Sequence, residues 1–326
     1  MKRRQLIASL GAAGAITLLP SGAFAQEAFP SSVIRIVVPI AAGGVTDAMA
    51  RTLADEMKKQ LTVPVIVDNK PGGNFGIGLQ AVASAKPDGH TIGWIFASAM
   101  TTLPHLYKGL TYKPSDFQPV GTLVTSHFVL AVPKSSPYNN LREYVEAMKK
   151  QKSPGLLAVS AVGGGPHLLM EGVSAASGFS LQPVAYRGEA PAVLELVAGQ
   201  VPAFVGVMAS VAEHYKTGSV KVLAISSEQR TADLPDVPTF KEQGFPSGVV
   251  TFWHGLSVPA GTPRAVVDKL NAIVRTAANS PAFQARLKGQ ADTYLGLSTP
   301  EQMDNLIRIE SQQNEQLIKA RNIRVE

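Results

Sequence analysis

Short β-branched segments alternate with amphipathic segments along almost the whole chain, and this alternation restricts the fold more than any other feature. Residues 33–38 form a β-branched run typical of a buried strand. In residues 46–60, which follow, Met49, Leu53 and Met57 recur every four positions and form one apolar helical stripe. The same order repeats downstream, with strands expected at residues 63–67, 91–96, 156–160, 183–186, 203–207 and 220–225 and helices at residues 77–85, 167–176, 191–198 and 210–215. Such alternation predicts an α/β fold, with mostly parallel sheets covered by helices on both faces.

Two apolar segments, residues 120–132 and 249–258, are longer than their neighbours. The chain also has too many predicted strands for one compact sheet, so we interpret these segments as crossovers between two α/β domains. One domain is then expected to combine residues 26–130 with residues 252–326, and the other to consist of residues 131–251. The two domains are thus interleaved along the chain.

The first 25 residues have the pattern of an export signal. Lys2, Arg3 and Arg4 precede an uncharged, mostly apolar stretch, and Ala23-Phe24-Ala25 fits a small-x-small cleavage site. We therefore predict a secretory signal peptide that is cut after Ala25. The Arg3-Arg4 pair also resembles a twin-arginine signal, and an uncleaved anchor is the alternative. Because the 326 residues include no cysteine, no disulfide stabilises the exported chain.

Net charge and motif searches argue against several classes of function. The chain carries a net charge of +6, but three positive charges belong to the signal peptide, and its removal leaves +3. Basic residues do not cluster with aromatic ones, so we expect no nucleic-acid partner. The six histidines lack metal-ligand spacing, and the phosphate-loop and G-x-S-x-G nucleophile patterns are absent. We therefore predict no metal, no cofactor and no catalytic residues.

Three glycine-rich loops follow predicted strands and precede predicted helices, an arrangement that suits small anions. The first loop contains Ala41, Gly43 and Gly44, whose backbone N–H groups can turn toward an anion, and Thr46 or Asp47 can cap the helix. Asp47 is expected to hold the loop or to meet a cationic or hydroxyl group of the ligand. The alternative is an ordinary capped turn.

The second loop contains Gly164 and Gly165, and beside them His167 can donate a hydrogen bond to a carboxylate. In the third loop Arg187, next to Gly188, stands at a strand end, where a guanidinium can clamp a carboxylate. The alternatives are a flexible turn with a surface histidine and an ordinary ion pair.

A weaker candidate follows the strand that ends at Phe96. The hydroxyl groups of Ser98 and Thr101 could reach a ligand there. A simple turn stabilised by serine and threonine side chains is the alternative.

These loops belong to a series of motifs that covers nearly the whole mature chain. The series comprises Pro39 with Gly43, Gly44, Asp47 and Arg51, then residues 67–72, 86–91, 164–168, 186–192, 199–201, 234–239 and 259–263. In this order the motifs resemble the extracytoplasmic solute receptors of tripartite tricarboxylate transporters, also called the Bordetella uptake gene family.

The resemblance implies a two-lobed, type II periplasmic binding protein-like fold with two crossover strands. It implies a monomer in the periplasm that closes around a small carboxylate and delivers it to a membrane permease. The family's first loop, which holds a carboxylate through backbone N–H groups and bridging waters, maps onto residues 41–47. Its second loop maps onto Gly164, Gly165 and His167, and its clamp onto Arg187 and Gly188.

The sequence departs from the family pattern at three places. Many relatives carry Lys at position 187, Pro202 stands where the family usually has an acid, and residues 207–210 are apolar where some relatives are polar. These departures leave the far end of the ligand unassigned. A receptor that reports its ligand to a membrane sensor is an alternative function, and an exported hydrolase is disfavoured because no nucleophile–base set is present.

Overall fold

The computed structural model describes residues 29–160, 162–186, 188–232, 234–248, 251–287 and 297–324. The predicted signal peptide and Arg187 lie outside the described residues. The strands are β1 (Ile34–Val38), β2 (Val65–Asn69), β3 (Thr91–Phe96), β4 (Phe117–Pro133), β5 (Gly155–Val159), β6 (Leu181–Ala185), β7 (Phe204–Val207), β8 (Val220–Ile225) and β9 (Thr251–Pro259).

Helices follow most of these strands. They are α1 (Val45–Lys58), α2 (Gly76–Ala83), α3 (Ala97–Thr101), α4 (Leu103–Leu106), α5 (Leu141–Lys150), α6 (Gly165–Ser177), α7 (Glu189–Val197), α8 (Met208–Lys216), α9 (Arg264–Ala278), α10 (Pro281–Leu287) and α11 (Pro300–Ala320), with short 3-10 turns at Pro114–Asp116 and Pro246–Gly248. The expected alternation of strands and helices is confirmed.

The described strands form one continuous mixed sheet rather than two mostly parallel sheets. Their order is β2-β1-β3-β9-β4-β7-β5-β6, and β8 also pairs with β4. The pairs of β1 with β2 and β3, and of β5 with β6 and β7, are parallel, whereas every pair made by β4 or β9 is antiparallel. The expectation of two mostly parallel sheets is therefore wrong, because two long strands run side by side through the middle.

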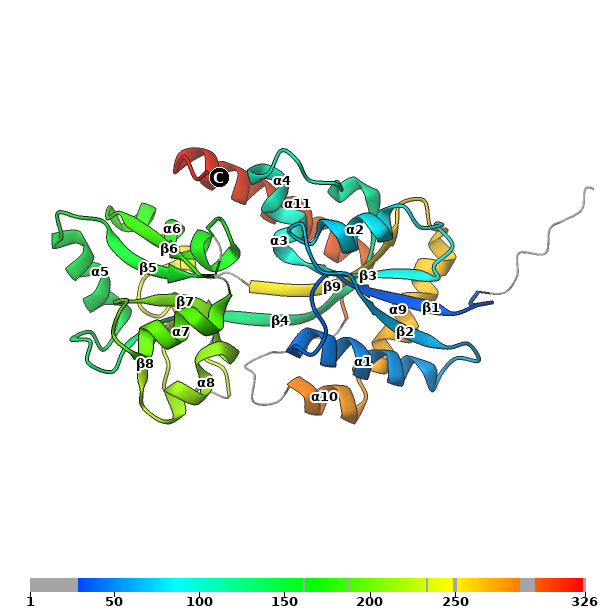
Figure 1. The fold of residues 1–326 in the computed structure, drawn as a ribbon, viewed down its shortest axis with the longest axis horizontal. Helices are drawn as coiled ribbons and strands as arrows, with labels where there is room; N and C mark the ends of the chain where they lie inside the picture. Colours follow the sequence, from blue (N-terminus) through cyan, green and yellow to red (C-terminus); the bar gives the residue numbers. More distant parts are fainter. Residues whose placement is uncertain are drawn as a thin grey trace, which may run out of the picture.

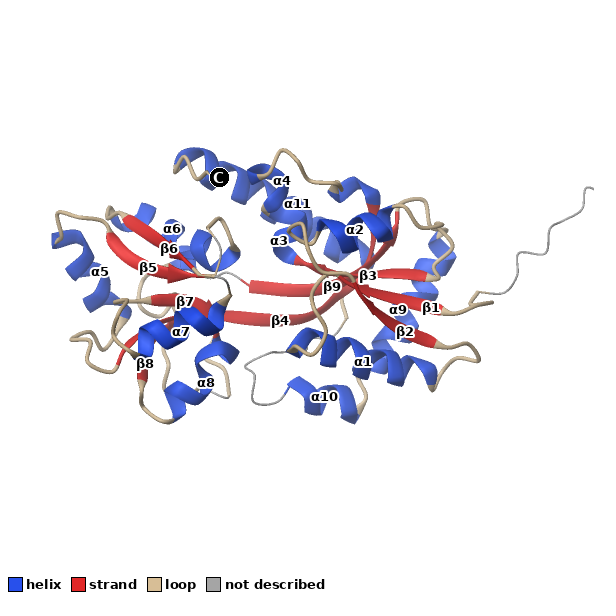
Figure 2. Ribbon diagram, viewed as in Figure 1, coloured by secondary structure: helices blue, strands red, loops and turns tan. Residues whose placement is uncertain are grey.

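β4 links the two ends of the sheet. From Phe117 to His127 it pairs with β9, and from Phe128 to Pro133 it pairs with β7 and β8. Figures 1 and 2 show β4 and β9 as long strands between a group of elements around β1–β3 and a group around β5–β8. We call these groups the first half and the second half of the sheet.

Helices cover both faces of each half. In the first half, α1 and α9 enclose one apolar cluster, and α2, α3 and α11 enclose another on the opposite face. In the second half, α5 and α6 cover one face while α7 and α8 cover the other. Met49, Leu53 and Met57, the stripe expected from the sequence, are at most 1% exposed. Burial of these stripes holds each helix on its face of the sheet.

The last helix, α11, begins at a capping box in which Thr299 accepts from the backbone N–H of Gln302 and the Gln302 side chain accepts from Thr299. It packs on α3 and β4 of the first half and then extends over α6 of the second half (Figure 1). Its inner face therefore borders both halves. None of the described helices is long and apolar enough to cross a membrane.

Candidate functional site

The loops after β1, β2 and β5 and the start of α3 meet around a cavity of about 470 Å³, which we call the loop cavity. Of the predicted site residues, Ala41, Ser98 and Gly164 line it. The parallel strands of both halves place these loops at their carboxyl ends, where open α/β sheets bind ligands. The structure thus brings together the first loop, the second loop and Ser98 around one cavity.

The first loop is shaped by an internal hydrogen bond. Gly43 has a φ of +92°, and its N–H donates to Oδ2 of Asp47 over 2.9 Å. Gly44 is the N-cap of α1 with extended backbone, and no side chain caps the helix. The expected capping by Thr46 or Asp47 is therefore wrong, because the Asp47 carboxylate turns back to Gly43 instead.

An arginine stabilises Asp47 in this position. Arg51, one helical turn later, donates to Asp47 through Nε over 3.0 Å and also bonds to Oδ1 of Asn69. The Arg51 hydrogen bond lowers the pKa of Asp47 below its ordinary value, against the opposing effect of burial. Asp47 is 4% exposed and does not line the cavity, so it holds the loop.

The second loop repeats this arrangement with different chemistry. Gly163 has a φ of +76°, and its N–H donates to Nδ1 of His167 over 2.9 Å. Nε2 of His167 lies 3.5 Å from Oε1 of Glu171, and Glu171 in turn accepts from Nε of Arg321 over 2.8 Å. Burial by itself would raise the pKa of Glu171, but the nearby His167 ring and the hydrogen bond from Arg321 outweigh it and lower that pKa.

His167 is 2% exposed, and both of its ring nitrogens face protein groups. The expected hydrogen bond from this side chain to a ligand carboxylate does not fit the geometry, because the Gly163 N–H occupies Nδ1 and Nε2 faces Glu171. His167 supports the second loop, as Asp47 supports the first.

Both loops leave helix N-terminal N–H groups facing outward. The N–H groups of Gly44, Val45 and Thr46 at α1, and those of Gly165 and His167 at α6, have no acceptor among the described residues. A Cβ added at Gly44 would meet nothing within 4 Å. No described residue that lines the loop cavity carries a charge. The N-terminus of α6, whose N-cap Gly164 lines the cavity, and the N-terminus of α1, which follows the lining residue Ala41 in the same loop, are the sources of positive potential near it.

The remaining predicted residues are placed differently. Thr101 lies in α3, its hydroxyl donates to the carbonyl of Ala97, and it is 2% exposed. The Thr46 side chain is buried and does not line the loop cavity. Gly188 is an exposed N-cap of α7 with a φ of +103°, and it does not line the loop cavity either. Arg187 lies outside the described residues, so the predicted clamp stays a prediction.

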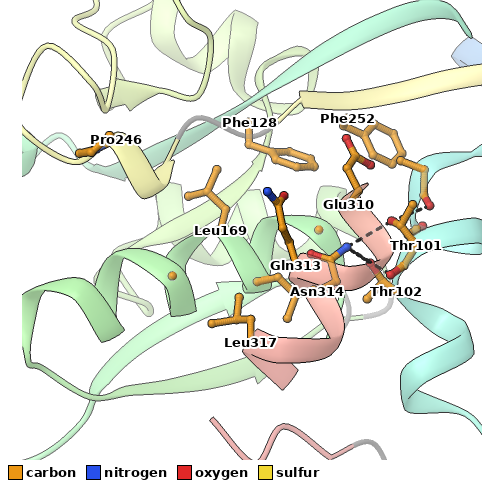
Figure 3. Close-up of a pocket in the computed structure, with 15 residues that line it drawn as sticks. Thr101, Thr102, Phe128, Leu169, Pro246, Phe252, Glu310, Gln313, Asn314 and Leu317 are labelled. Atoms are coloured by element: carbon orange, nitrogen blue, oxygen red, sulfur yellow. Dashed lines mark hydrogen bonds between the residues drawn. The ribbon is translucent and has the colours of Figure 1, made fainter. Parts of the chain in front are cut away.

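A second cavity of about 420 Å³ lies beside the first, between α3, α6 and α11 (Figure 3), and we call it the α11 cavity. Ser98 and Phe252 line both cavities. Gly165 and Thr101, two further predicted residues, line the α11 cavity. Its far wall consists of three polar residues on one face of α11, namely Glu310, Gln313 and Asn314.

Glu310 is the most perturbed carboxyl group at this site. Its Oε2 accepts from Nε1 of Trp253 over 2.9 Å, and burial raises the pKa of Glu310 to about 7, although the hydrogen bond opposes the increase. Sequence patterns did not reveal Glu310, Gln313 and Asn314 as site residues. Their spacing looks like the solvent side of an amphipathic helix, and only the position of α11 over both halves turns them inward.

The described residues contain no group of three or more His, Cys, Asp or Glu side chains placed to hold a metal ion. The site as a whole offers backbone donors, two cavities and a buried carboxyl group. Such an arrangement can bind and orient a small polar molecule.

Comparison with known proteins identifies relatives over most of the chain. A sequence model of the family described as "Tripartite tricarboxylate transporter family receptor" matches residues 49–323. The structure of the periplasmic binding protein BugD is 34% identical, with a TM-score of 0.75 over 91% of this chain and 100% of that one.

Two further structures contain ligands. MatC from Rhodopseudomonas palustris with bound malate is 29% identical, with a TM-score of 0.74 over 89% of this chain and 100% of that one. R. palustris Rpa4515 with adipate is 26% identical, with a TM-score of 0.78 over 91% of this chain and 99% of that one. The α/β fold of this chain matches these periplasmic binding protein structures.

Proposed function

We propose that this chain, which belongs to the family of tripartite tricarboxylate transporter receptors, captures a small carboxylate in the loop cavity. Membership of this family makes it a solute-binding protein and not an enzyme. One observation carries the proposal. The loops that lead into α1 and α6 come from opposite halves of the sheet and meet, at Ala41 and Gly164, at one cavity that has no charged side chain among its described lining residues. A carboxylate accepts hydrogen bonds from helix N-terminal N–H groups and is stabilised by both helix dipoles.

The binding group is proposed to comprise the backbone of Ala41, Gly43, Gly44 and Thr46 in the first loop and of Gly164, Gly165 and His167 in the second loop. Ser98 adds a hydroxyl from α3, and Asp47 keeps the first loop in shape. Arg187 and Gly188 are proposed to clamp the carboxylate from the third loop. Malate and adipate, the ligands of two relatives, both carry carboxylates.

The two halves of the sheet are proposed to act as two lobes of a type II binding protein that close around the ligand. Residues 26–130 with 252–326 form one lobe and residues 131–251 the other. Support comes from β4, which changes pairing partners between His127 and Phe128, three residues before the proposed boundary. In the order of the described strands, β9 and β4 stand between β3 of the first half and β7 of the second half, so these two strands suit a hinge.

We place the mature protein in the periplasm as a monomer, after cleavage behind Ala25, and we propose the membrane subunits of a tripartite tricarboxylate-type transporter as its partner. Membership of the receptor family supports the transporter, and the likeness to the periplasmic binding protein BugD supports the compartment.

A thermal-shift panel of mono-, di- and tricarboxylates, amino acids and aromatic acids tests the proposal. A ligand at 100 times its dissociation constant adds about 2.7 kcal/mol to the free energy of unfolding. For a chain of this size the melting temperature then rises by a few degrees. If no carboxylate raises the melting temperature, the proposed function is wrong.

A further inference from the structure

The α11 cavity has no occupant in the proposed function, yet it adjoins the loop cavity. Ser98 and Phe252 line both cavities, and the consecutive residues Gly164 and Gly165 line one cavity each. The start of α6 therefore lies at the junction. A ligand whose carboxylate lies at the helix N-termini can extend its other end beneath α11.

The chemistry of the α11 cavity is opposite to that of the loop cavity. Glu310 is the one charged side chain among the described residues that line it. Its Oε2 accepts from Trp253, while Oε1 has no partner among the described residues. A carboxylate oxygen is therefore available to a ligand on this wall.

A second acceptor lies one helical turn further along α11. Nδ2 of Asn314 donates to the carbonyl and the hydroxyl of Thr101 and to the hydroxyl of Thr102, over 3.1 to 3.3 Å. Figure 3 shows these bonds on the side of Asn314 that faces α3. Because the amide nitrogen is fully engaged, Oδ1 of Asn314 remains as an acceptor on the cavity wall.

The apolar wall also suits a cation. The rings of Phe128 and Phe252 lie with their centroids 5.5 Å apart, and Figure 3 shows both beside Glu310 and Gln313. Aromatic faces attract cations through their quadrupole. At a pH above 7, where Glu310 is ionised, a second carboxylate at this position would instead be repelled by the Glu310 carboxylate.

We propose that the α11 cavity binds an ammonium group, so that the ligand is an aminocarboxylate whose carboxylate lies in the loop cavity and whose ammonium group contacts Glu310 and Asn314. This inference rests on the proposed function and names the class of carboxylate. Donors in one cavity and acceptors in the next match the two ends of a zwitterion.

Titration calorimetry with matched ligands tests the inference. Three linear series with chains of three to seven carbons share one carboxylate and end in an amino, a methyl or a second carboxylate group. The measurements are made at pH 8, where Glu310 is ionised because its pKa lies near 7. At the chain length that binds most tightly, the amino compound is expected to bind at least tenfold more tightly than the methyl compound and the dicarboxylate of the same length.

Two variants separate a role in recognition from a structural effect. Glu310→Gln keeps an acceptor for the Trp253 indole but removes the charge. It should lower the affinity for the amino compound at least tenfold, whereas the affinity for the methyl compound should change by less than threefold. Glu315→Gln is the control, because Glu315 lies on the same helix, pairs with Lys319 and lines neither cavity. It should change no affinity.

The inference is wrong if dicarboxylates bind as tightly as the amino compounds, or if E310Q and E315Q behave alike. The proposed function survives either result as long as some carboxylate binds. If no compound with a carboxylate binds, both the inference and the proposed function fail.

Discussion

The first and second loops solve the same structural problem with different chemistry. In each, a glycine with positive φ donates its N–H to the side chain four residues later, Gly43 to Asp47 and Gly163 to His167. In each, the next glycine is the N-cap of a helix without a side-chain cap. The turn is thus fixed from inside, and the helix N–H groups remain available for a ligand.

The difference lies in what anchors the supporting side chain. Asp47, whose side chain is 6% exposed, is held by Arg51 of the same helix, and the Arg51 side chain is 52% exposed, against 29% for Arg321 in the second loop's support. His167 is followed by Glu171, which is held by Arg321 just beyond α11, and the Glu171 side chain is 9% exposed. Support for the first loop is therefore local, whereas support for the second loop depends on where the C-terminal helix lies.

The largest expected effect is the loss of ligand binding in Gly44→Leu. Gly44 has a φ of −85° and open space around its Cα, so leucine causes neither backbone strain nor a clash within the protein. Its side chain instead fills the space proposed for the carboxylate. We expect no binding in calorimetry and a melting temperature close to that of the wild type.

Gly44→Ala serves as the graded control and should weaken binding less than leucine does. A Gly44→Leu variant that binds the carboxylate with wild-type affinity would place the ligand away from the first loop.

The second prediction compares the two arginines. Arg321→Met leaves the buried Glu171 carboxylate without its cation and should cost about 3–5 kcal/mol of folding free energy. Arg51→Met also removes the cation of a buried carboxylate, but the Arg51 side chain is 52% exposed against 29% for Arg321, so solvent screens this pair more and its loss should cost less, about 1 kcal/mol. Urea unfolding of both variants measures the difference.

The double variant Glu171→Gln/Arg321→Met removes the unpaired charge and should recover part of the lost stability. Equal costs for Arg51→Met and Arg321→Met would contradict the distinction between local and distant support.

Much of the fold was predictable from local patterns. The strand at residues 91–96 coincides with β3, and the apolar stripe of Met49, Leu53 and Met57 is buried in α1. The mixed sheet was not predictable, because the pairing of β4 with β9 joins segments more than a hundred residues apart and no local pattern encodes it.

For the candidate site, the glycine loops after strands were enough to predict that Ala41 and Gly164 lie near each other, since only backbone freedom and position in the sheet were needed. The roles of Asp47 and His167 could be recognised only in the structure, because they depend on hydrogen bonds that each side chain accepts from the glycine four residues earlier. Glu310 stayed hidden because its inward direction depends on the docking of α11.

The third prediction uses the opposite titration of the carboxyl groups. Asp47 and Glu171 have lowered pKa values, so their contribution to stability is lost as pH falls through those values. Glu310 keeps its proton in the folded protein up to a pKa of about 7, whereas the unfolded chain releases it near 4.5. Rising pH between these values therefore destabilises the folded state through Glu310.

Glu310→Gln removes this contribution. Relative to the variant, the wild type should lose roughly 3 kcal/mol of unfolding free energy between pH 4.5 and 7.5. Urea unfolding across this range measures the difference, which also cancels the contribution of buried His254, whose pKa burial lowers to about 3. A difference that does not change with pH would show that Glu310 titrates normally.

The smallest expected effect is a change in tryptophan emission when ligand binds. This change tests whether the ligand reaches the α11 cavity beside the second loop. Trp253 donates its indole N–H to Glu310, whereas Trp94 donates to His254 and lies in the apolar cluster of the first half. A ligand group at Glu310 alters the hydrogen bond of Trp253 alone. Trp253→Phe should abolish the emission change and Trp94→Phe should preserve it. An emission change that is lost in Trp94→Phe and kept in Trp253→Phe would place the ligand nearer to β3 than to α11. The difference between local support of the first loop and distant support of the second loop would then have no part in recognition.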